Sequence, residues 1–153
     1  MGRYLGDGWV RNRKERNNNL SGITICCGKH KLDKFKQEIG DLLHYCLIET
    51  RTTFELQFPN KELATFLDQF GRGAKNKRLP GFVFSLPIPI LKRILDGYFD
   101  SDGHVDNKGV TSVSSISKEL IYGIAHCVAK VYHTPYSIYK RVNSETAIIE
   151  GRV

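Results

Sequence analysis

The sequence predicts an α+β fold built from two related halves, each with the order helix, two strands, helix, two strands, helix. A helical segment that ends in Asp-Gly occurs twice, at residues 2–8 and 97–103, and the copies are displaced by 95 positions (102 minus 7). Each copy is followed by a strand, a loop and a second strand, and then by an amphipathic helix. We therefore expect a single domain composed of repeat 1 (residues 1–80) and an incomplete repeat 2 (residues 81–153).

Apolar spacing and capping residues indicate the elements of repeat 1. After the opening helix we expect strands at 9–13 and 23–27, a helix at 31–43, strands at 46–48 and 54–58, and a helix at 60–70. Asn60 is placed to cap the last of these helices. The side chains expected to face inward from that helix are Leu63, Phe66, Leu67 and Phe70.

Repeat 2 follows the same plan after a basic, glycine-rich loop at residues 71–80. Its hairpin loop is shorter by eight residues, since Ile23 matches Val110 at a displacement of 87 rather than 95. We expect helices at 90–99 and 117–132, a hairpin over 104–114 between them, and strands at 136–141 and 146–150. Repeat 2 stops where a final helix would begin and the opening helix has barely two turns, so the chain looks cut from something longer at both ends.

Composition is that of a globular protein. The 153 residues are 41% hydrophobic and 25% charged, and no apolar run approaches the roughly 18 residues needed to cross a bilayer. The four cysteines show neither Cys-x-x-Cys spacing nor histidines at zinc-ligand intervals, so we expect reduced and mostly buried thiols. These features predict an intracellular protein in a reducing compartment, cytoplasmic or nucleoid-associated, without a membrane partner.

The net charge favours a polyanionic partner. Twenty-three Lys and Arg against 16 Asp and Glu give a formal charge of +7, with a pI near 9.3. Arg11 and Arg13 alternate just after the first Asp-Gly, so a strand would place both on one face, with Lys14 and Arg16 following. A charged edge strand that resists aggregation would show the same pattern. Charge alone leaves both interpretations open.

Asp7 and Asp102 lie in the last turn of their helices, at the negative end of the helix dipole. This placement costs on the order of 0.3–1 kcal/mol unless a positive charge offsets it. Small residues four positions apart on each helix allow close approach, which would bring the acids together, while Gly8 and Gly103 supply a left-handed residue after each helix. An isolated Asp-Gly is ordinary turn chemistry. Its repetition favours a two-carboxylate site for Mg²⁺, which can position water and stabilise charge on a phosphate.

Two signature segments and the loop between them resemble a known family. Residues 2–8 (Gly-Arg-Tyr-Leu-Gly-Asp-Gly) and 95–103 (Leu-Asp-Gly-Tyr-Phe-Asp-Ser-Asp-Gly) are similar to the paired helices of LAGLIDADG homing endonucleases. Residues 71–80 (Gly-x-x-Ala-x-x-Lys-x-Leu-Pro) resemble the Lys-x-Ile-Pro loop of the intein-borne members. The resemblance covers essentially the whole chain. It implies a monomer with pseudo-twofold symmetry, whose two saddle-shaped antiparallel sheets straddle double-stranded DNA around a central pair of signature helices.

The resemblance also implies an activity and its residues. Asp7 and Asp102 match the acids that bind Mg²⁺ and cut both DNA strands, leaving short 3′ overhangs. Lys77 matches a lysine that in similar intein endonucleases helps to activate water or to stabilise the transition state. By the same spacing (77 minus 7), the second such lysine falls beyond Val153, which leaves open whether the chain itself cleaves DNA.

DNA contacts are expected on the sheet face away from the helices. The candidates are Arg11, Arg13, Lys14, Arg16, Thr24, Arg51, Thr53, Lys108, Thr111, Tyr139 and Arg141. Trp9 and His104 occupy equivalent positions just after the acids. We expect Trp9 to pack, and His104 to lie either near the scissile phosphate or exposed.

Two classes of function follow. The first is a site-specific double-strand DNA endonuclease, a hydrolase forming the nuclease part of an intein embedded in a host protein. The second is a nucleic-acid-binding module of the same family, such as a maturase or a regulator, or a nuclease that has lost cleavage. An acid at both Asp7 and Asp102 favours the endonuclease.

Overall fold

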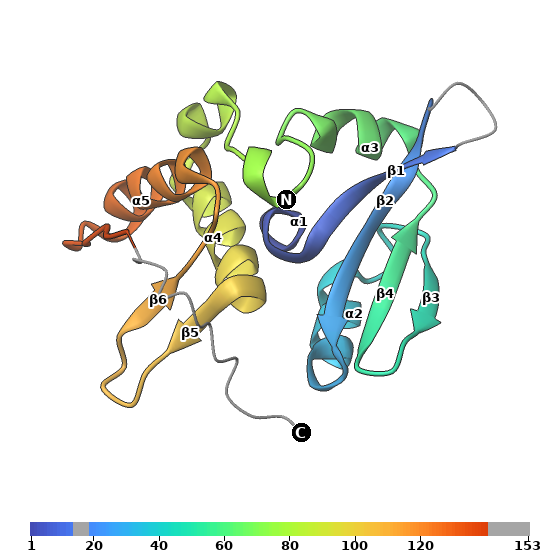
Figure 1. The fold of residues 1–153 in the computed structure, drawn as a ribbon, viewed down its shortest axis with the longest axis horizontal. Helices are drawn as coiled ribbons and strands as arrows, with labels where there is room; N and C mark the ends of the chain where they lie inside the picture. Colours follow the sequence, from blue (N-terminus) through green and yellow to red (C-terminus); the bar gives the residue numbers. More distant parts are fainter. Residues whose placement is uncertain (14–18, 141–153) are drawn as a thin grey trace.

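In a computed structural model of the chain, residues 1–13 and 19–140 are described. Helices α1 and α4 lie side by side at the centre, between the sheets of the two halves (Figure 1). The first half contains α1 (Gly2–Asp7), β1 (Gly8–Arg13), β2 (Asn19–Gly28), α2 (Leu32–Ile39), β3 (Cys46–Glu49), β4 (Thr53–Phe58) and α3 (Lys61–Asp68). The second half contains α4 (Ile88–Asp102), β5 (Gly103–Val105), β6 (Thr111–Val113) and α5 (Lys118–Tyr132). The short 3₁₀ helices are η1 (Lys29–Lys31), η2 (Ala74–Asn76) and η3 (Gly81–Ser85).

The first half forms a four-stranded antiparallel sheet in the order β1-β2-β4-β3. Alternate residues on its central strands, such as the directly paired Ile25 and Leu56, are buried on one face. Phe35 from α2 and Leu67 from α3 belong to the same core, so both helices cover this face. The predicted α+β class with antiparallel sheets is confirmed, and the first half has the predicted order of helices and strands.

Close packing of α1 against α4 depends on small residues. A Cβ at Gly2 would lie 2.1 Å from the carbonyl oxygen of Ile94, and a Cβ at Gly6 would lie 2.4 Å from the Cβ of Ser101. Because successive residues of α1 meet successive residues of α4, the two helices run in the same direction. Their C-terminal ends, each carrying an acid, therefore meet at one end of the pair.

Each central helix passes directly into a strand, so the prediction of a left-handed residue at Gly8 and Gly103 is wrong. Their φ angles are −108° and −76°, which is extended backbone. Glycine is needed for a different reason. A Cβ at Gly8 would lie 2.6 Å from the Tyr4 Cα, and a Cβ at Gly103 would lie 2.3 Å from the Phe99 carbonyl oxygen. The chain turns tightly against the last turn of its own helix and leaves no room for a side chain.

In the second half, β5 and β6 form a two-stranded antiparallel sheet, and α5 packs against α4. Gly103 pairs with Val113 as Gly8 pairs with Ile25. The hairpins therefore correspond at a displacement of 88 (113 minus 25), one residue from the predicted 87.

The N-cap predicted at Asn60 is confirmed, because its side chain accepts a hydrogen bond from the Leu63 amide at 2.8 Å. Ser117 caps α5 in the same way, since its hydroxyl accepts a hydrogen bond from the Leu120 amide at 3.2 Å. The helix predicted at residues 90–99 is also present but longer, since α4 begins at Ile88 with proline in its first turn.

Two predicted helical details are wrong. Helix α2 ends at Ile39 instead of residue 43, because Gly40 adopts a positive φ of 53°, and Leu42 is consequently 85% exposed. In α3, Phe66 is exposed rather than inward-facing, and Ala64 takes its place in the core. The buried stripe of α3 is therefore narrower than the apolar pattern suggests.

The strand predicted at residues 136–141 is not formed over 136–140, which lie outside regular secondary structure. Its last residue, and the strand predicted at 146–150, lie outside the described residues. All four cysteines are free, with Cys27 and Cys127 buried, Cys26 half-buried and Cys46 exposed, the last against expectation. Across the described ranges, every helix falls short of the length and apolar character required to span a membrane.

Candidate active site at the ends of the paired helices

Asp7 and Asp102 are the last residues of α1 and α4, and the packing of the two helices brings their ends together. A Cβ at Gly6 would lie 3.2 Å from the carboxyl carbon of Asp102, so that carboxyl group lies against the last turn of α1. Both acids are half-buried. The structure thus brings together the two carboxylates that the sequence repeat pairs.

The surroundings of the two acids disfavour two negative charges. Burial raises the pKa of Asp7, while the positive charges of Lys77, Lys31 and Arg3 lower it. Burial also raises the pKa of Asp102, and the neighbouring Asp7 carboxylate raises it further. Because the net effect is a raised pKa at both, the nearby basic groups do not fully offset burial and mutual repulsion.

Lys77 is buried beside the acids, with only 6% of its surface exposed. Its ammonium group donates hydrogen bonds to the carbonyl oxygens of Tyr4 at 2.9 Å and Gly6 at 2.8 Å, in the last turn of α1. A positive charge at this position counters the negative end of the helix dipole. Burial lowers the pKa of Lys77, and the charges of Asp102 and Asp7 raise it. Lys77 is therefore not a solvated loop lysine.

The loop that carries Lys77 is held by its own motif residues. Gly71 has a positive φ of 88°, and a Cβ there would lie 1.9 Å from the Asn76 carbonyl oxygen, so only glycine fits. Leu79 is buried against α5. The Ser117 hydroxyl donates to the Lys77 carbonyl oxygen at 2.6 Å. The glycine, lysine and leucine of residues 71–80 are therefore spaced so that their contacts fix the backbone of Lys77 between the two halves.

The open face of the first sheet lies opposite the core. Trp9, Thr24 and Gln57 are directly paired across β1, β2 and β4, and they alternate with core residues on their strands. Arg11 donates a hydrogen bond to the Gln57 side chain at 2.5 Å. Trp9 is 39% exposed, more than the expected packing role implies.

The predicted DNA contacts have different outcomes. Thr24 is wrong as a direct contact, because it is fully buried on the open face. Tyr139 is 80% exposed but not on a strand. The other described candidates keep accessible surface: Arg11 on β1, Arg51 in the β3–β4 turn, Thr53 on β4, Lys108 in the β5–β6 turn and Thr111 on β6. Lys14, Arg16, Arg141 and the side chain of Arg13 lie outside what the structure describes.

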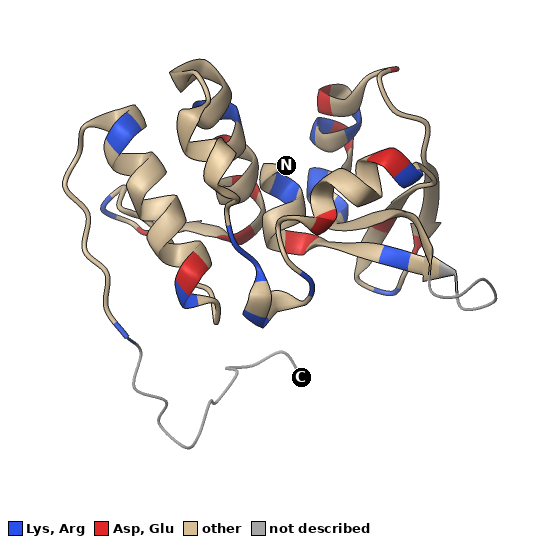
Figure 2. Cartoon of the chain, turned by 90° about the horizontal axis from the view of Figure 1, so that it is seen from above, with Lys and Arg blue, Asp and Glu red and all other residues tan. Residues whose placement is uncertain are grey.

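Basic residues are spread over both halves of the chain and interspersed with acidic ones (Figure 2). Charge distribution by itself therefore does not mark a single binding patch. His104, the equivalent of Trp9 in the second half, is exposed on β5 and pairs with Ser112 of β6. Of the two alternatives expected for His104, the structure therefore matches the exposed position.

Comparisons with known proteins show which family and fold the chain resembles. Residues 90–151 match the family model of a LAGLIDADG-like domain. The fold is similar to that of the homing endonuclease I-DmoI in complex with DNA and Mn, with a TM-score of 0.61 and 15% identity over 84% of this chain and 73% of that one. The chain therefore contains a LAGLIDADG-like domain over residues 90–151, and its fold is that of a LAGLIDADG homing endonuclease. Mesophilic variants of I-DmoI give a TM-score of 0.60 over 84% of this chain and 72% of theirs, at 14% identity.

Two longer proteins contain segments similar to this chain. The DNA-directed RNA polymerase subunit Rpo1C of Methanocaldococcus jannaschii is 30% identical over 135 residues, which are 85% of this chain and 15% of that protein. The probable translation initiation factor IF-2 of Thermococcus kodakarensis is 29% identical over 119 residues, which are 69% of this chain and 10% of that protein. The chain therefore spans only a small part of the length of each.

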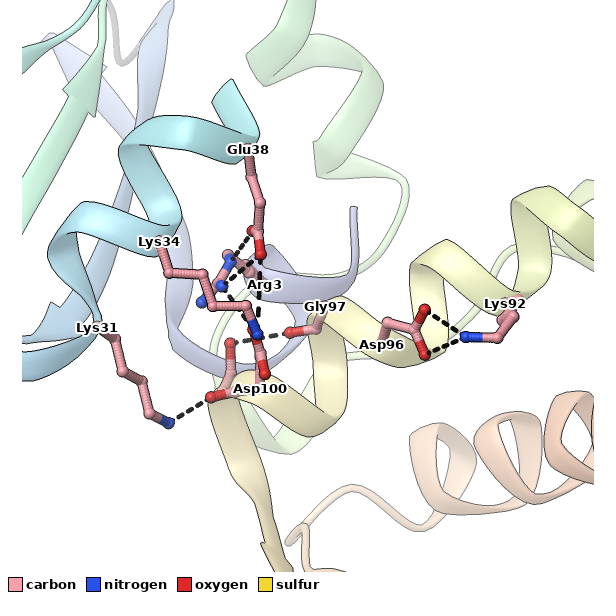
Figure 3. A network of polar contacts seen from close by, with 9 residues as sticks. Arg3, Lys31, Lys34, Glu38, Lys92, Asp96, Gly97 and Asp100 are labelled. Atoms are coloured by element: carbon pink, nitrogen blue, oxygen red, sulfur yellow. Dashed lines mark hydrogen bonds and ion pairs between the residues drawn. The ribbon is translucent and has the colours of Figure 1, made fainter. Parts of the chain in front are cut away.

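The candidate site also includes basic residues that the sequence did not indicate. Arg3 in α1 is buried and donates to Glu38 of α2 at 2.8 Å and to Asp100 of α4 at 2.7 Å (Figure 3). Its guanidinium group lies 4.5 Å from the centre of the Phe35 ring. Lys31 of η1 donates to the backbone carbonyl oxygen of Asp100. Nothing in local periodicity marks these residues, because their partners are distant in the sequence.

Proposed function

We propose that this chain is the nuclease domain of a site-specific homing endonuclease that hydrolyses both strands of DNA with Mg²⁺. The observation that carries the proposal is the meeting of Asp7, Asp102 and the buried Lys77 at the ends of two packed helices. A merely structural Asp-Gly turn would not require a buried lysine beside two acids of raised pKa.

The donor set fits a divalent cation. In the described part of the chain no group of three or more His, Cys, Asp or Glu side chains is arranged for metal binding, so the two carboxylates would be the protein ligands. Mg²⁺ suits such a site, because it takes few carboxylates and fills its shell with water and phosphate oxygens. When bound, the ion would supply Lewis acidity and a water of lowered pKa. I-DmoI structures with DNA and Mn or Ca support divalent-metal use in this family.

The residues of the chain would divide the work. Asp7 and Asp102 would hold the metal at the meeting point of the helices, where their mutual repulsion favours a cation. Lys77 would keep a positive charge beside the phosphate being cut and counter the dipole of α1. The open sheet face, with Arg11 oriented by Gln57, would bind the DNA. A single-residue variant of I-DmoI in complex with its target DNA, similar in fold at a TM-score of 0.61, supports DNA binding by a chain of this fold.

The protein context supports an intein. Two relatives with unrelated names, a polymerase subunit and an initiation factor, share this segment as 15% and 10% of their length. A segment that recurs inside different proteins is expected of a mobile element carried by host genes. Such a domain would act as a monomer, because its two acids already come from one chain. Free thiols at all four cysteines support a reducing, intracellular setting.

The test compares cleavage by the full-length protein and by acid variants. The substrate is a plasmid carrying the uninterrupted host-gene junction, incubated with Mg²⁺. We expect Asp7→Asn or Asp102→Asn to lower the cleavage rate by more than roughly 100-fold, the scale of a lost transition-state interaction, with DNA affinity in Ca²⁺ nearly unchanged.

The matched control is Asp96→Asn, on the same helix as Asp102 but exposed and paired, among the described residues, with Lys92 and Tyr132. It should cut at the normal rate. Robust double-strand cutting by a double Asp7→Asn, Asp102→Asn variant would overturn the site. Tight, sequence-specific binding with no cutting by the unmodified protein would instead indicate a binding module of the same family.

A further inference from the structure

Each central helix has a lysine at its C-terminal turn. The Lys77 ammonium group donates to the carbonyl oxygens of Tyr4 and Gly6 in α1. The Lys31 ammonium group donates to the carbonyl oxygen of Asp100, two residues before Asp102 in α4 (Figure 3). Both lysines thus occupy the negative end of a helix that terminates in one of the paired acids.

The lysine that serves α4 comes from the other half of the chain. Lys31 ends η1, directly after β2, and crosses to α4 from the first half. By the hairpin displacement of 88, its equivalent in the second half is Glu119 (31 plus 88), an exposed acid at the start of α5. The two halves therefore have equivalent backbones here but opposite charges, with a lysine at position 31 and a glutamate at position 119.

Lys31 binds the backbone carbonyl oxygen of Asp100 rather than its carboxylate, which has other partners. The Asp100 carboxylate is already paired with Arg3 at 2.7 Å and with Lys34 at 2.5 Å. Lys31 is half-buried, and its charge lowers the pKa of both Asp7 and Asp102. The charge of Lys31 therefore acts on both acids, and its hydrogen bond is to the helical turn that carries Asp102.

We propose that Lys31 is a positioning residue of the cleavage site, which fixes the last turn of α4 and its Asp102 carboxylate as Lys77 fixes the last turn of α1. The role in cleavage rests on the endonuclease function proposed above. The role in holding the helix end does not, and the two can be tested separately.

The first experiment measures backbone amide hydrogen exchange by NMR in the full chain without metal. In Lys31→Met, exchange at residues 101–104 should rise roughly tenfold, the effect of losing one charge-assisted hydrogen bond, while residues 6–9 keep their protection. Lys31→Arg, which retains charge and donors, should restore most of the protection. The control is Lys29→Met in the same turn, whose ammonium group pairs with Glu49 instead. Unchanged exchange at 101–104 in Lys31→Met would overturn the proposal.

The second experiment follows supercoiled plasmid through nicked to linear product with Mg²⁺. Lys31→Met should cut at least roughly tenfold more slowly and accumulate nicked circles, because the acid on α4 is less well placed than the acid on α1. DNA affinity measured in Ca²⁺ should stay within roughly twofold of normal. Lys31→Arg should regain most of the rate, and Lys29→Met should resemble the unmodified protein.

The outcomes are distinguishable. Normal cutting by Lys31→Met would overturn its role in the cleavage site, even if amide exchange changes. If the unmodified protein cuts no junction DNA, the endonuclease proposal fails, and amide exchange still decides whether Lys31 fixes α4. Equal losses in Lys29→Met and Lys31→Met would show a general effect of η1 and would contradict the assignment.

Discussion

The two central helices have the same backbone arrangement but carry different side chains at equivalent positions. The displacement of 95 pairs Arg3 of α1 with Tyr98 of α4, and Leu5 of α1 with Asp100 of α4. Arg3 and Asp100 form an ion pair, whereas Leu5 and Tyr98 are at most 1% exposed. The contact between Arg3 and Asp100 is therefore charged. The equivalent contact positions, Leu5 and Tyr98, are apolar apart from the tyrosine hydroxyl. The two helices therefore correspond in backbone position while the side chains at equivalent positions differ.

The same asymmetry extends to the acids. In the part of the chain that the structure describes, the basic groups that lower the pKa of Asp7 or Asp102 are Lys77, Lys31 and Arg3. All three belong to the first half. Each half of the chain thus contributes one carboxylate to the candidate site, whereas the first half contributes all three of these basic groups. Matched substitutions at equivalent positions can test this difference.

The largest effect is expected at the helix contact itself. Gly2→Ala would place a Cβ 2.1 Å from the Ile94 carbonyl oxygen, whereas the equivalent Gly97→Ala would place one 3.2 Å from the Arg3 amide nitrogen. We expect Gly2→Ala to lower the free energy of unfolding by about 3 kcal/mol, since backbone atoms cannot yield locally. For Gly97→Ala we expect a loss below about 1 kcal/mol, partly offset by the higher helix propensity of alanine. Urea unfolding measures both, and equal losses would contradict the difference in fit.

A smaller effect is expected at the next pair of equivalent positions. Arg3→Met should cost about 2 kcal/mol of unfolding free energy, below the usual value for a broken buried pair because Glu38 and Asp100 retain partial exposure. Tyr98→Phe should be neutral or stabilising by up to about 1 kcal/mol, because the Tyr98 hydroxyl is buried without a hydrogen-bond partner among the described residues.

Thermal unfolding of both variants against Arg3→Lys separates charge from packing. Arg3→Lys keeps a positive charge but loses the two-sided guanidinium contact and its stacking on Phe35. It should fall between Arg3→Met and the unmodified protein. A Tyr98→Phe variant as unstable as Arg3→Met would show that the hydroxyl has a partner and that the two sides are alike.

The smallest expected effect is the pH dependence of metal-free stability. The pKa of Asp102 is raised in the folded protein, mainly by burial and further by Asp7, so the folded state holds this proton more tightly than the unfolded chain. The group therefore costs stability as pH rises from its ordinary value of 3.8 through the folded pKa. Asp102→Asn should unfold at the same temperature as the unmodified protein below that range. Near neutral pH, in EDTA, it should melt roughly 2–4 °C higher.

The same measurement with Mg²⁺ sharpens the comparison. Added Mg²⁺ should raise the melting temperature of the unmodified protein by binding the folded state, and should raise that of Asp102→Asn much less. Asp96→Asn, on the exposed side of α4, should respond to Mg²⁺ like the unmodified protein. A lower melting temperature for Asp102→Asn at neutral pH would contradict the repulsion between the acids.

Much of the fold was predictable because it depends on local patterns. The N-caps at Asn60 and Ser117, the alternating strands of the first sheet and the small residues of α1 and α4 follow from spacing within a few residues. The conformation of Gly8 was not predictable in this way. Sequence shows that a helix ends there, but whether the chain turns by a left-handed residue or runs straight into a strand depends on the sheet that receives it.

The candidate site was predictable where a motif carries it and not where contacts are long-range. Asp7, Asp102 and Lys77 lie in recognisable segments, and the structure brings them together. Burial of Thr24 was missed, since alternation places a residue on a face but does not show what covers it.

By itself, the sequence determined that the molecule is duplicated, that each half presents one acid at a helix end, and that a lysine-bearing loop joins them. Those features are written in residue type and short spacing. Only the tertiary structure decided that Arg3 bridges two helices and that Lys31 reaches Asp100, 69 positions away. The reason is physical: hydrogen bonds and charge effects act over a few ångströms in space, and chain folding sets which distant residues come within that range.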